Sequence, residues 1–212
     1  MNKNSFIYEI GTEELPASYI RPAITFLQEY FTSRLQEAQL TFDEIKNYST
    51  PRRLCITITG LPAAQENSSE EIVGPPKRIA FYENGNLNKV GQGFLKKQEC
   101  VEKDIIIKKL PKGEYLSVIK HVKGKQTEEI LSTIAQKVIP KIPFPKKMHW
   151  GNSTLLFARP IRWLLALYND KLLDFKIDRI KTDTISFGNR FQNLHNTINI
   201  KSTKEYIPLL AV

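Results

Sequence analysis

Residues 5–35 read SFIYEIGTEELPASYIRPAITFLQEYFTSRL, and they combine a strand pattern with a helix pattern. Residues 5–10 alternate loosely between apolar and polar side chains and predict a strand that ends at Gly11. Glu13, Glu14 and Pro16 are typical of a helix start. The next apolar residues are spaced by three or four positions and define one buried helix face: Ile20, Ile24, Leu27, Phe31 and Leu35. We expect this face to pack on a sheet formed by residues 5–10 and 53–60.

The rest of the chain predicts further strands and short helices. Residues 52–62 alternate as a second strand, and the polar segment 63–71 is typical of an exposed connection. A helix is expected at 91–98, a hairpin at 105–122, a helix at 127–138 capped by Thr127, and two strands within 157–177. The predicted fold class is therefore α+β, with mixed, largely antiparallel sheets and packed helices. We expect two subdomains: residues 1–62 as a strand-helix-strand unit and residues 72–212 as a basic α+β unit, truncated at its C-terminus.

Charge and composition narrow the function classes. The chain of 212 residues has a formal net charge of +9, and residues 71–212 hold 25 of the 31 Lys and Arg. A surface that binds polyanions would therefore lie in this second part. The alternative is that these lysines only form a surface exposed to solvent. No stretch reaches the length of a membrane span, and the N-terminus lacks the apolar core of a signal peptide, so we expect a cytoplasmic protein without membrane contact.

Motifs for catalysis or metal binding are absent from the sequence. The three histidines are scattered without metal-ligand spacing, and no P-loop or GxSxG motif occurs. We therefore assign no catalytic residue, no metal ligand and no cofactor to this fragment. An acidic cluster is formed by three glutamates, Glu9, Glu13 and Glu14. This cluster keeps open the alternative of a small-molecule enzyme, although helix capping and surface exposure explain these residues as well.

Basic residues next to aromatic rings give a stronger indication of function than any catalytic or metal-binding motif. FPKKMHWG at 144–151 and FARPIRW at 157–163 each place basic residues next to one of the two tryptophans. Basic groups bind phosphate and aromatic rings stack on bases, so these residues predict nucleic-acid contact. The competing interpretation is that the tryptophans pack in the core, which we expect of Trp163, and that the arginines pair with buried carboxylates. The candidate nucleic-acid-binding residues are Arg52, Arg53, Lys77, Arg78, Lys146, Lys147, Trp150, Arg159, Arg162 and Arg190.

Five phrases in this order carry a family resemblance: IYEIGTEELPA at 7–17, TPRRL at 50–54, GPPK at 74–77, FPKKMHWG and FARPIRW. With them the chain resembles the β subunit of the bacterial two-subunit glycyl-tRNA synthetase. The chain departs from that family at Asn189, where a histidine is usual, so no role that needs an imidazole is expected there.

The resemblance implies a tRNA-handling subunit without chemistry of its own. Its partners would be the tRNA for glycine and an α subunit that binds glycine and ATP with Mg²⁺, joined in a hetero-oligomer in the full-length form. The chain would then be an N-terminal fragment that supports tRNA binding and assembly. A second hypothesis is a stand-alone RNA-binding module without a ligase role.

Overall fold

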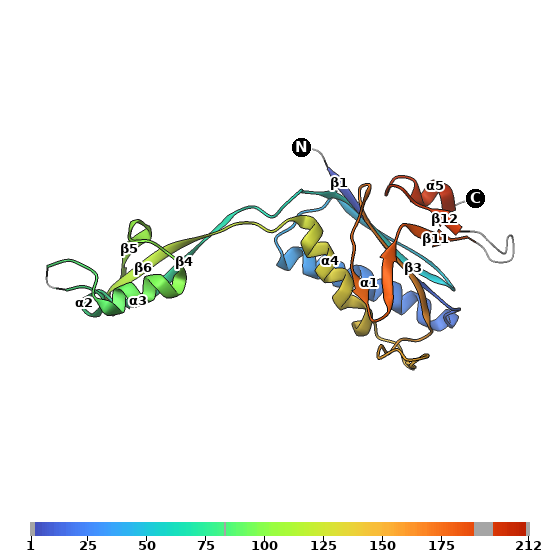
Figure 1. The fold of residues 1–212 in the computed structure, drawn as a ribbon, viewed down its shortest axis with the longest axis horizontal. Helices are drawn as coiled ribbons and strands as arrows, with labels where there is room; N and C mark the ends of the chain where they lie inside the picture. The colour runs from blue at the N-terminus through green and yellow to red at the C-terminus, as the bar shows by residue number, and fades with distance from the viewer. Residues whose placement is uncertain (1–2, 83, 189–196, 211–212) are drawn as a thin grey trace. The chain divides into compact units, whose positions relative to one another are not determined.

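The computed structural model describes residues 3–82, 84–188 and 197–210, and it divides into two compact units. Unit 1 comprises residues 1–65 and 125–212, and unit 2 comprises residues 66–124. Helices and strands alternate irregularly along the chain, and the sheets are mixed or antiparallel, which confirms the α+β class (Figure 1).

Unit 1 is built on a sheet with the strand order β2-β3-β1-β7-β10-β9, with β8 paired to β7. All pairs are antiparallel except β10 with β7. The strands are β1 (Asn4–Thr12), β2 (Glu44–Thr50), β3 (Arg53–Leu61), β7 (Ile161–Tyr168), β8 (Lys171–Leu172), β9 (Lys176–Ile177) and β10 (Ile180–Asp183). The same unit contains the helices α1 (Ala17–Glu37), α4 (Thr127–Val138) and α5 (Tyr206–Leu210), and a separate strand pair, β11 (Ile185–Phe187) with β12 (Thr197–Asn199).

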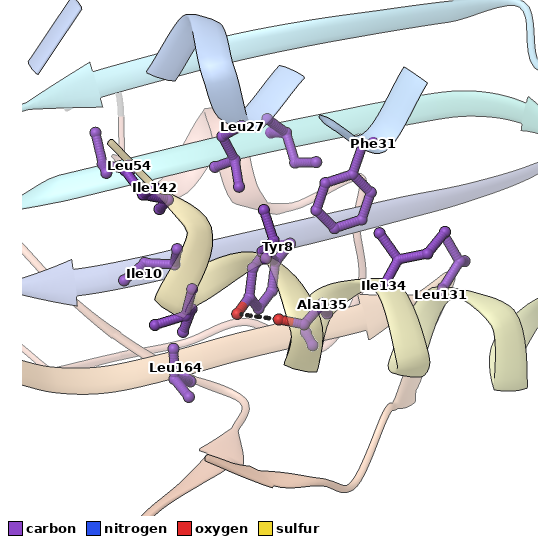
Figure 2. Packing of buried hydrophobic residues seen from close by; sticks show 14 of the residues in the cluster. Tyr8, Ile10, Leu27, Phe31, Leu54, Leu131, Ile134, Ala135, Ile142 and Leu164 are labelled. Carbon is purple, nitrogen blue, oxygen red and sulfur yellow. Dashed lines mark hydrogen bonds between the residues drawn. The ribbon is translucent and has the colours of Figure 1, made fainter. Parts of the chain in front are cut away.

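Alternation along β1 gives the sheet two different faces. Phe6, Tyr8 and Ile10 point into the larger apolar cluster, which α1 and α4 cover, whereas Ile7 belongs to a smaller cluster with Tyr206 of α5 (Figures 1 and 2). Four residues of the predicted α1 stripe are buried and Ile20 is half-buried against the same cluster, so the stripe prediction is confirmed.

Helix α4 is tied to β1 by a hydrogen bond as well as by packing. The Tyr8 hydroxyl donates to the carbonyl of Ala135 at 3.0 Å (Figure 2). A tyrosine hydroxyl is protonated at neutral pH, and burial raises the pKa of Tyr8 further, so the donor proton stays in place at alkaline pH as well. The helix spans the predicted residues, but Thr127 does not cap it. The Thr127 hydroxyl donates instead to the carbonyl of Pro62 at 2.7 Å.

Unit 2 is a three-stranded antiparallel sheet with two helices. Its strand order is β4-β6-β5, from β4 (Ser68–Pro76), β5 (Ile105–Leu110) and β6 (Gly113–Val122). Helices α2 (Lys77–Ala80) and α3 (Lys89–Gln98) share a small apolar core with Leu116 and Val118 of β6. The hairpin and the helix expected within 105–122 and 91–98 are therefore confirmed.

These units are divided differently from the subdomains 1–62 and 72–212 expected from the sequence. The chain leaves unit 1 near the predicted boundary, but it returns at Lys125, inside the predicted second subdomain. The physical reason is strand pairing, because β7 joins the sheet directly beside β1. At the crossing, the Gln65 amide donates to the Lys125 carbonyl at 2.9 Å, so the outgoing and returning segments of unit 1 are hydrogen-bonded to each other.

Gly11 on β1 lies opposite Trp163 on β7, and it has no room for a side chain. A Cβ atom at Gly11 would lie 1.9 Å from Cε2 of the Trp163 indole, and the ring cannot bend away as a flexible side chain could. Glycine is therefore required at this position by close packing.

We predict that Gly11→Ala lowers the free energy of unfolding by about 1–3 kcal/mol or more. The matched control is Gly93→Ala, because a Cβ at this exposed position in α3 meets nothing within 4 Å and alanine favours a helix by about 1 kcal/mol. Thermal denaturation followed by circular dichroism measures both changes. Equal melting temperatures for Gly11→Ala and the wild type would contradict the packing argument.

Candidate functional site

Glu9 of β1 is a buried carboxylate on which several polar side chains of unit 1 converge. The Glu9 side chain is completely buried, and Nε of Arg53 lies 3.1 Å from its Oε1 atom. The Ser186 hydroxyl lies 2.8 Å from Oε1 and 3.0 Å from Oε2. Trp163 Nε1 also donates to Oε1, and the Tyr206 hydroxyl donates to Oε2. A cation from β3 and hydrogen-bond donors from β7, β11 and α5 therefore converge on one side chain of β1.

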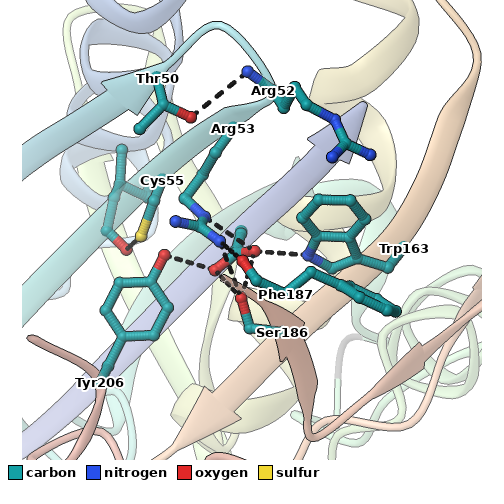
Figure 3. Close-up of polar contacts among 10 residues, drawn as sticks. Thr50, Arg52, Arg53, Cys55, Trp163, Ser186, Phe187 and Tyr206 are labelled. Atoms are coloured by element: carbon teal, nitrogen blue, oxygen red, sulfur yellow. Dashed lines mark hydrogen bonds and ion pairs between the residues drawn. The ribbon is translucent and has the colours of Figure 1, made fainter. Parts of the chain in front are cut away.

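The guanidinium of Arg53 extends the network beyond Glu9. Nη2 donates to the Ser186 hydroxyl at 3.2 Å and to the carbonyl of Phe187 (Figure 3). Only 13% of the Arg53 side chain is exposed. Burial raises the pKa of the Tyr206 hydroxyl above its ordinary value, so Tyr206 keeps the proton that it donates to Glu9.

This geometry favours a structural role for Glu9 over a catalytic one. Both carboxylate oxygens already accept hydrogen bonds, and no face of the side chain reaches solvent. Glu13 lies elsewhere and pairs with the exposed Arg162, Nε to Oε1, at 3.4 Å, while Glu14 is exposed. The three glutamates therefore do not converge on one site, and the alternative of a small-molecule enzyme gains no support from their placement.

Trp163 is buried, as predicted, with 7% of its surface exposed. Its ring lies over Gly11 and 4.7 Å from the ring of Phe187, centroid to centroid. The guanidinium carbon of Arg52 lies 6.0 Å from the indole centroid, within cation–π range. The sequence TPRRL thus supplies two cations to one buried cluster, Arg52 to Trp163 and Arg53 to Glu9.

Four further candidates of unit 1, Lys146, Lys147, Trp150 and Arg159, lie on the segment before β7, and Arg162 lies within β7. The backbone of Met148 bonds to that of Phe157, which brings the two basic phrases side by side. Lys146 and Lys147 are exposed, and Nζ of Lys147 donates to the carbonyl of Pro140 at 3.1 Å. Trp150 is half-buried and packs against the larger apolar cluster. Arg159 is half-buried and donates to the neighbouring carbonyl of Ala158 at 3.0 Å.

Lys77 and Arg78 lie in unit 2, where both side chains are exposed at α2. The structure therefore groups the candidates in three places: the Glu9 network, the segment 146–162, and α2. Arg190 and Asn189 fall outside the described residues.

Sequence reasoning missed Ser186 and Tyr206 as partners of Glu9, because single hydroxyl groups far apart in the sequence carry no spacing signal. It also did not single out Tyr82 and Lys112, which line one pocket with Lys77 and Arg78. The Asn84-Gly85 turn that follows Tyr82 is a sequence signal near this pocket.

The described residues contain neither a group of metal-ligating side chains nor a helix that could span a membrane. Within residues 3–82, 84–188 and 197–210, no three His, Cys, Asp or Glu side chains come together as metal ligands would. None of the helices in this described part of the chain combines the length and the apolar character needed to cross a membrane.

The match to a family model decides the family. Residues 6–212 match the model described as glycyl-tRNA synthetase beta subunit. The chain belongs to the glycyl-tRNA synthetase β-subunit family. It is 38% identical over 208 residues to the glycine–tRNA ligase beta subunit of Clostridioides difficile (strain 630), which covers 98% of this chain and 30% of that protein.

Two further members of the β-subunit family show the same partial coverage. The protein of the same name from Listeria welshimeri is 37% identical over 95% of this chain and 29% of its own length. The one from Nitratidesulfovibrio vulgaris is 38% identical over 88% of this chain and 27% of its own length. The chain thus spans less than a third of the length of these β-subunit relatives.

Removing Arg53 tests the structural role of the network. We predict that Arg53→Ala lowers the free energy of unfolding by about 3–5 kcal/mol, because it leaves the buried Glu9 carboxylate without its cation. The matched control is Arg162→Ala, whose ion pair with Glu13 is exposed and contributes at most about 1 kcal/mol. Chemical denaturation followed by tryptophan fluorescence compares the two, and similar losses in both variants would show that Arg53 is not the cation that stabilises Glu9.

Proposed function

We propose that this chain is the N-terminal part of the β subunit of a glycine–tRNA ligase. In this role it supports tRNA binding and assembly with a catalytic α subunit during ATP-dependent formation of glycyl-tRNA in the cytoplasm. The observation that carries the proposal is the family match over residues 6–212, together with relatives named glycine–tRNA ligase beta subunit that align with nearly the whole chain.

Chemistry is assigned to the α subunit in this proposal. Both carboxylate oxygens of the buried Glu9 already accept hydrogen bonds. The sequence contains no P-loop, and among the described residues no three His, Cys, Asp or Glu side chains come together as metal ligands would. We therefore infer that glycine, ATP and Mg²⁺ bind to the partner chain, and that the β chain needs no cofactor in this part.

Contacts to tRNA are assigned first to exposed cations. Lys146, Lys147 and Arg162 expose their side chains, and the backbone pairing of Met148 with Phe157 holds the two lysines close to Arg159. Such groups can neutralise phosphates and release counterions, which makes affinity salt-dependent. Arg53 is a weaker candidate, since its guanidinium is already bound to Glu9 and Phe187.

We predict that replacing Lys146, Lys147, Arg159 and Arg162 by alanine weakens tRNA binding and lowers the slope of log affinity against log salt. Each residue that contacts a phosphate should lower this slope by about one unit. The matched control removes the same charge from exposed lysines elsewhere in unit 1: Lys137, Lys176, Lys201 and Lys204. Filter binding of tRNA between about 50 and 200 mM salt measures the affinity of both fourfold variants. Equal losses of affinity in the two variants would contradict the assignment.

Assembly and the division of chemistry have a separate test. We expect the natural full-length protein, affinity-tagged in its host, to co-purify with a chain that supports glycine-dependent ATP–pyrophosphate exchange. The purified chain of 212 residues should show no such exchange by itself. Exchange by this chain alone would disprove the division of labour, and a tagged protein that captures no synthetase chain but binds tRNA would favour a stand-alone RNA-binding module.

A further inference from the structure

Unit 2 contains a pocket that no role described so far explains. It has a volume of about 680 Å³ and lies where the β5–β6 turn meets α2. This volume is within the range of small-ligand pockets in proteins. Its lining residues are Pro76, Lys77, Arg78, Phe81, Tyr82, Lys112, Gly113 and Glu114.

The described lining residues of this pocket carry more positive than negative charge. Nζ of Lys77 binds Oε2 of Glu114 at 2.8 Å, so among the described lining residues the one carboxylate is paired with one of three cations. Arg78 and Lys112 make no ion pair or hydrogen bond with another side chain of the described chain, and both are exposed. Two cations are therefore available to an anionic ligand.

An exposed aromatic ring lies among these cations. Tyr82 is 54% exposed, the largest exposed fraction among the large apolar and aromatic side chains of the described residues. Its backbone is fixed on both sides, because the Tyr82 amide donates to the Asn86 carbonyl at 2.8 Å and its carbonyl accepts from the Gly85 amide at 2.9 Å. A ring on a fixed backbone loses little freedom when a planar ligand stacks on it.

Glu114 adds an acceptor that a site for bare phosphate would not need. Glu114 is ionised at neutral pH, as an ordinary glutamate is, and the hydrogen bond from Lys77 lowers its pKa further. An ionised carboxylate accepts hydrogen bonds from hydroxyl and amino groups, both of which a ribonucleotide carries.

We propose that this pocket binds one unpaired nucleotide of an RNA, with the base on Tyr82 and the flanking phosphates at Arg78 and Lys112. The proposal rests on the proposed function for the choice of RNA. A base inside a duplex is stacked on its neighbours and cannot lie against Tyr82, so single-stranded segments and ends are the expected ligands.

The aromatic half of the proposal is tested with a fluorescein-labelled single-stranded RNA hexamer, a blunt RNA hairpin and the 212-residue chain, by fluorescence anisotropy. Tyr82→Ala should weaken hexamer binding about tenfold or more and leave hairpin binding unchanged, because stacking on an aromatic ring requires an unpaired base. Tyr82→Phe keeps the ring and should bind the hexamer like the wild type. Tyr48→Ala, which removes an exposed ring of β2 in unit 1, is the matched control and should change nothing.

The cationic half is tested with the same hexamer at several salt concentrations. Arg78→Ala combined with Lys112→Ala should lower the slope of log affinity against log salt by about two units. Lys103→Ala combined with Lys123→Ala removes two exposed lysines of unit 2 outside the pocket and should leave the slope unchanged.

The outcomes separate this proposal from the proposed function. Hexamer binding that is absent in the wild type, or unchanged in Tyr82→Ala, would overturn the pocket, even if tRNA still binds through other residues. Hexamer binding that depends on Tyr82 in a chain that does not bind tRNA would support the pocket and overturn the tRNA role. Hexamer affinity that falls in the Arg78→Ala and Lys112→Ala variant but not in Tyr82→Ala would indicate a surface that binds any polyanion, such as an acidic protein segment. This result would also overturn the nucleotide pocket.

Discussion

The buried carboxylate of Glu9 constrains four elements of unit 1 besides its own strand. Moving a carboxylate out of water is costly, and the cost is offset only when a cation and hydrogen-bond donors surround it. The cation comes from β3 and the donors come from β7, β11 and α5, so the network requires all four elements to be in place around β1 (Figure 3). A pair of this kind contributes little net stability compared with apolar packing, but it strongly disfavours arrangements that leave the charge unpaired. Glu9 therefore contributes to the specificity of the fold.

The neighbours of this network follow from the same constraint. Trp163 donates to Glu9 and fills the space above Gly11, so one indole satisfies a buried acceptor and replaces a side chain on the adjacent strand. Burial raises the pKa of the Cys55 thiol, with the Glu9 charge as a second cause, so this cysteine stays protonated and unreactive beside the carboxylate. Charge, close packing and strand pairing meet at the same few residues of β1, β3 and β7.

Much of the fold could be predicted because periodic patterns record local burial. The α1 stripe, the 105–122 hairpin and the 127–138 helix are set by residues near each other in the chain. Strand β2 was missed because Glu44–Thr50 is an exposed edge strand with only Ile45 half-buried, so no apolar alternation marks it. The pairing of β1 with β7 joins residues about 150 positions apart, which no local pattern encodes. For the same reason the sequence left open which carboxylate would pair with Arg53, since Glu9 lies on another strand.

The crossing between the two units has a consequence for folding kinetics. Residues 67 and 124 are held together inside unit 2, where the Gly124 amide donates to the Asn67 side chain at 2.9 Å and β4 pairs with β6 from Ser68 to Val122 onward. Once unit 2 has folded, β3 and α4 are joined through a short bridge instead of a flexible loop of about 60 residues, which lowers the entropy lost when α4 closes on the sheet. An inserted unit that holds its own two ends together thus lowers the entropy cost of bringing the two segments of unit 1 into contact during folding.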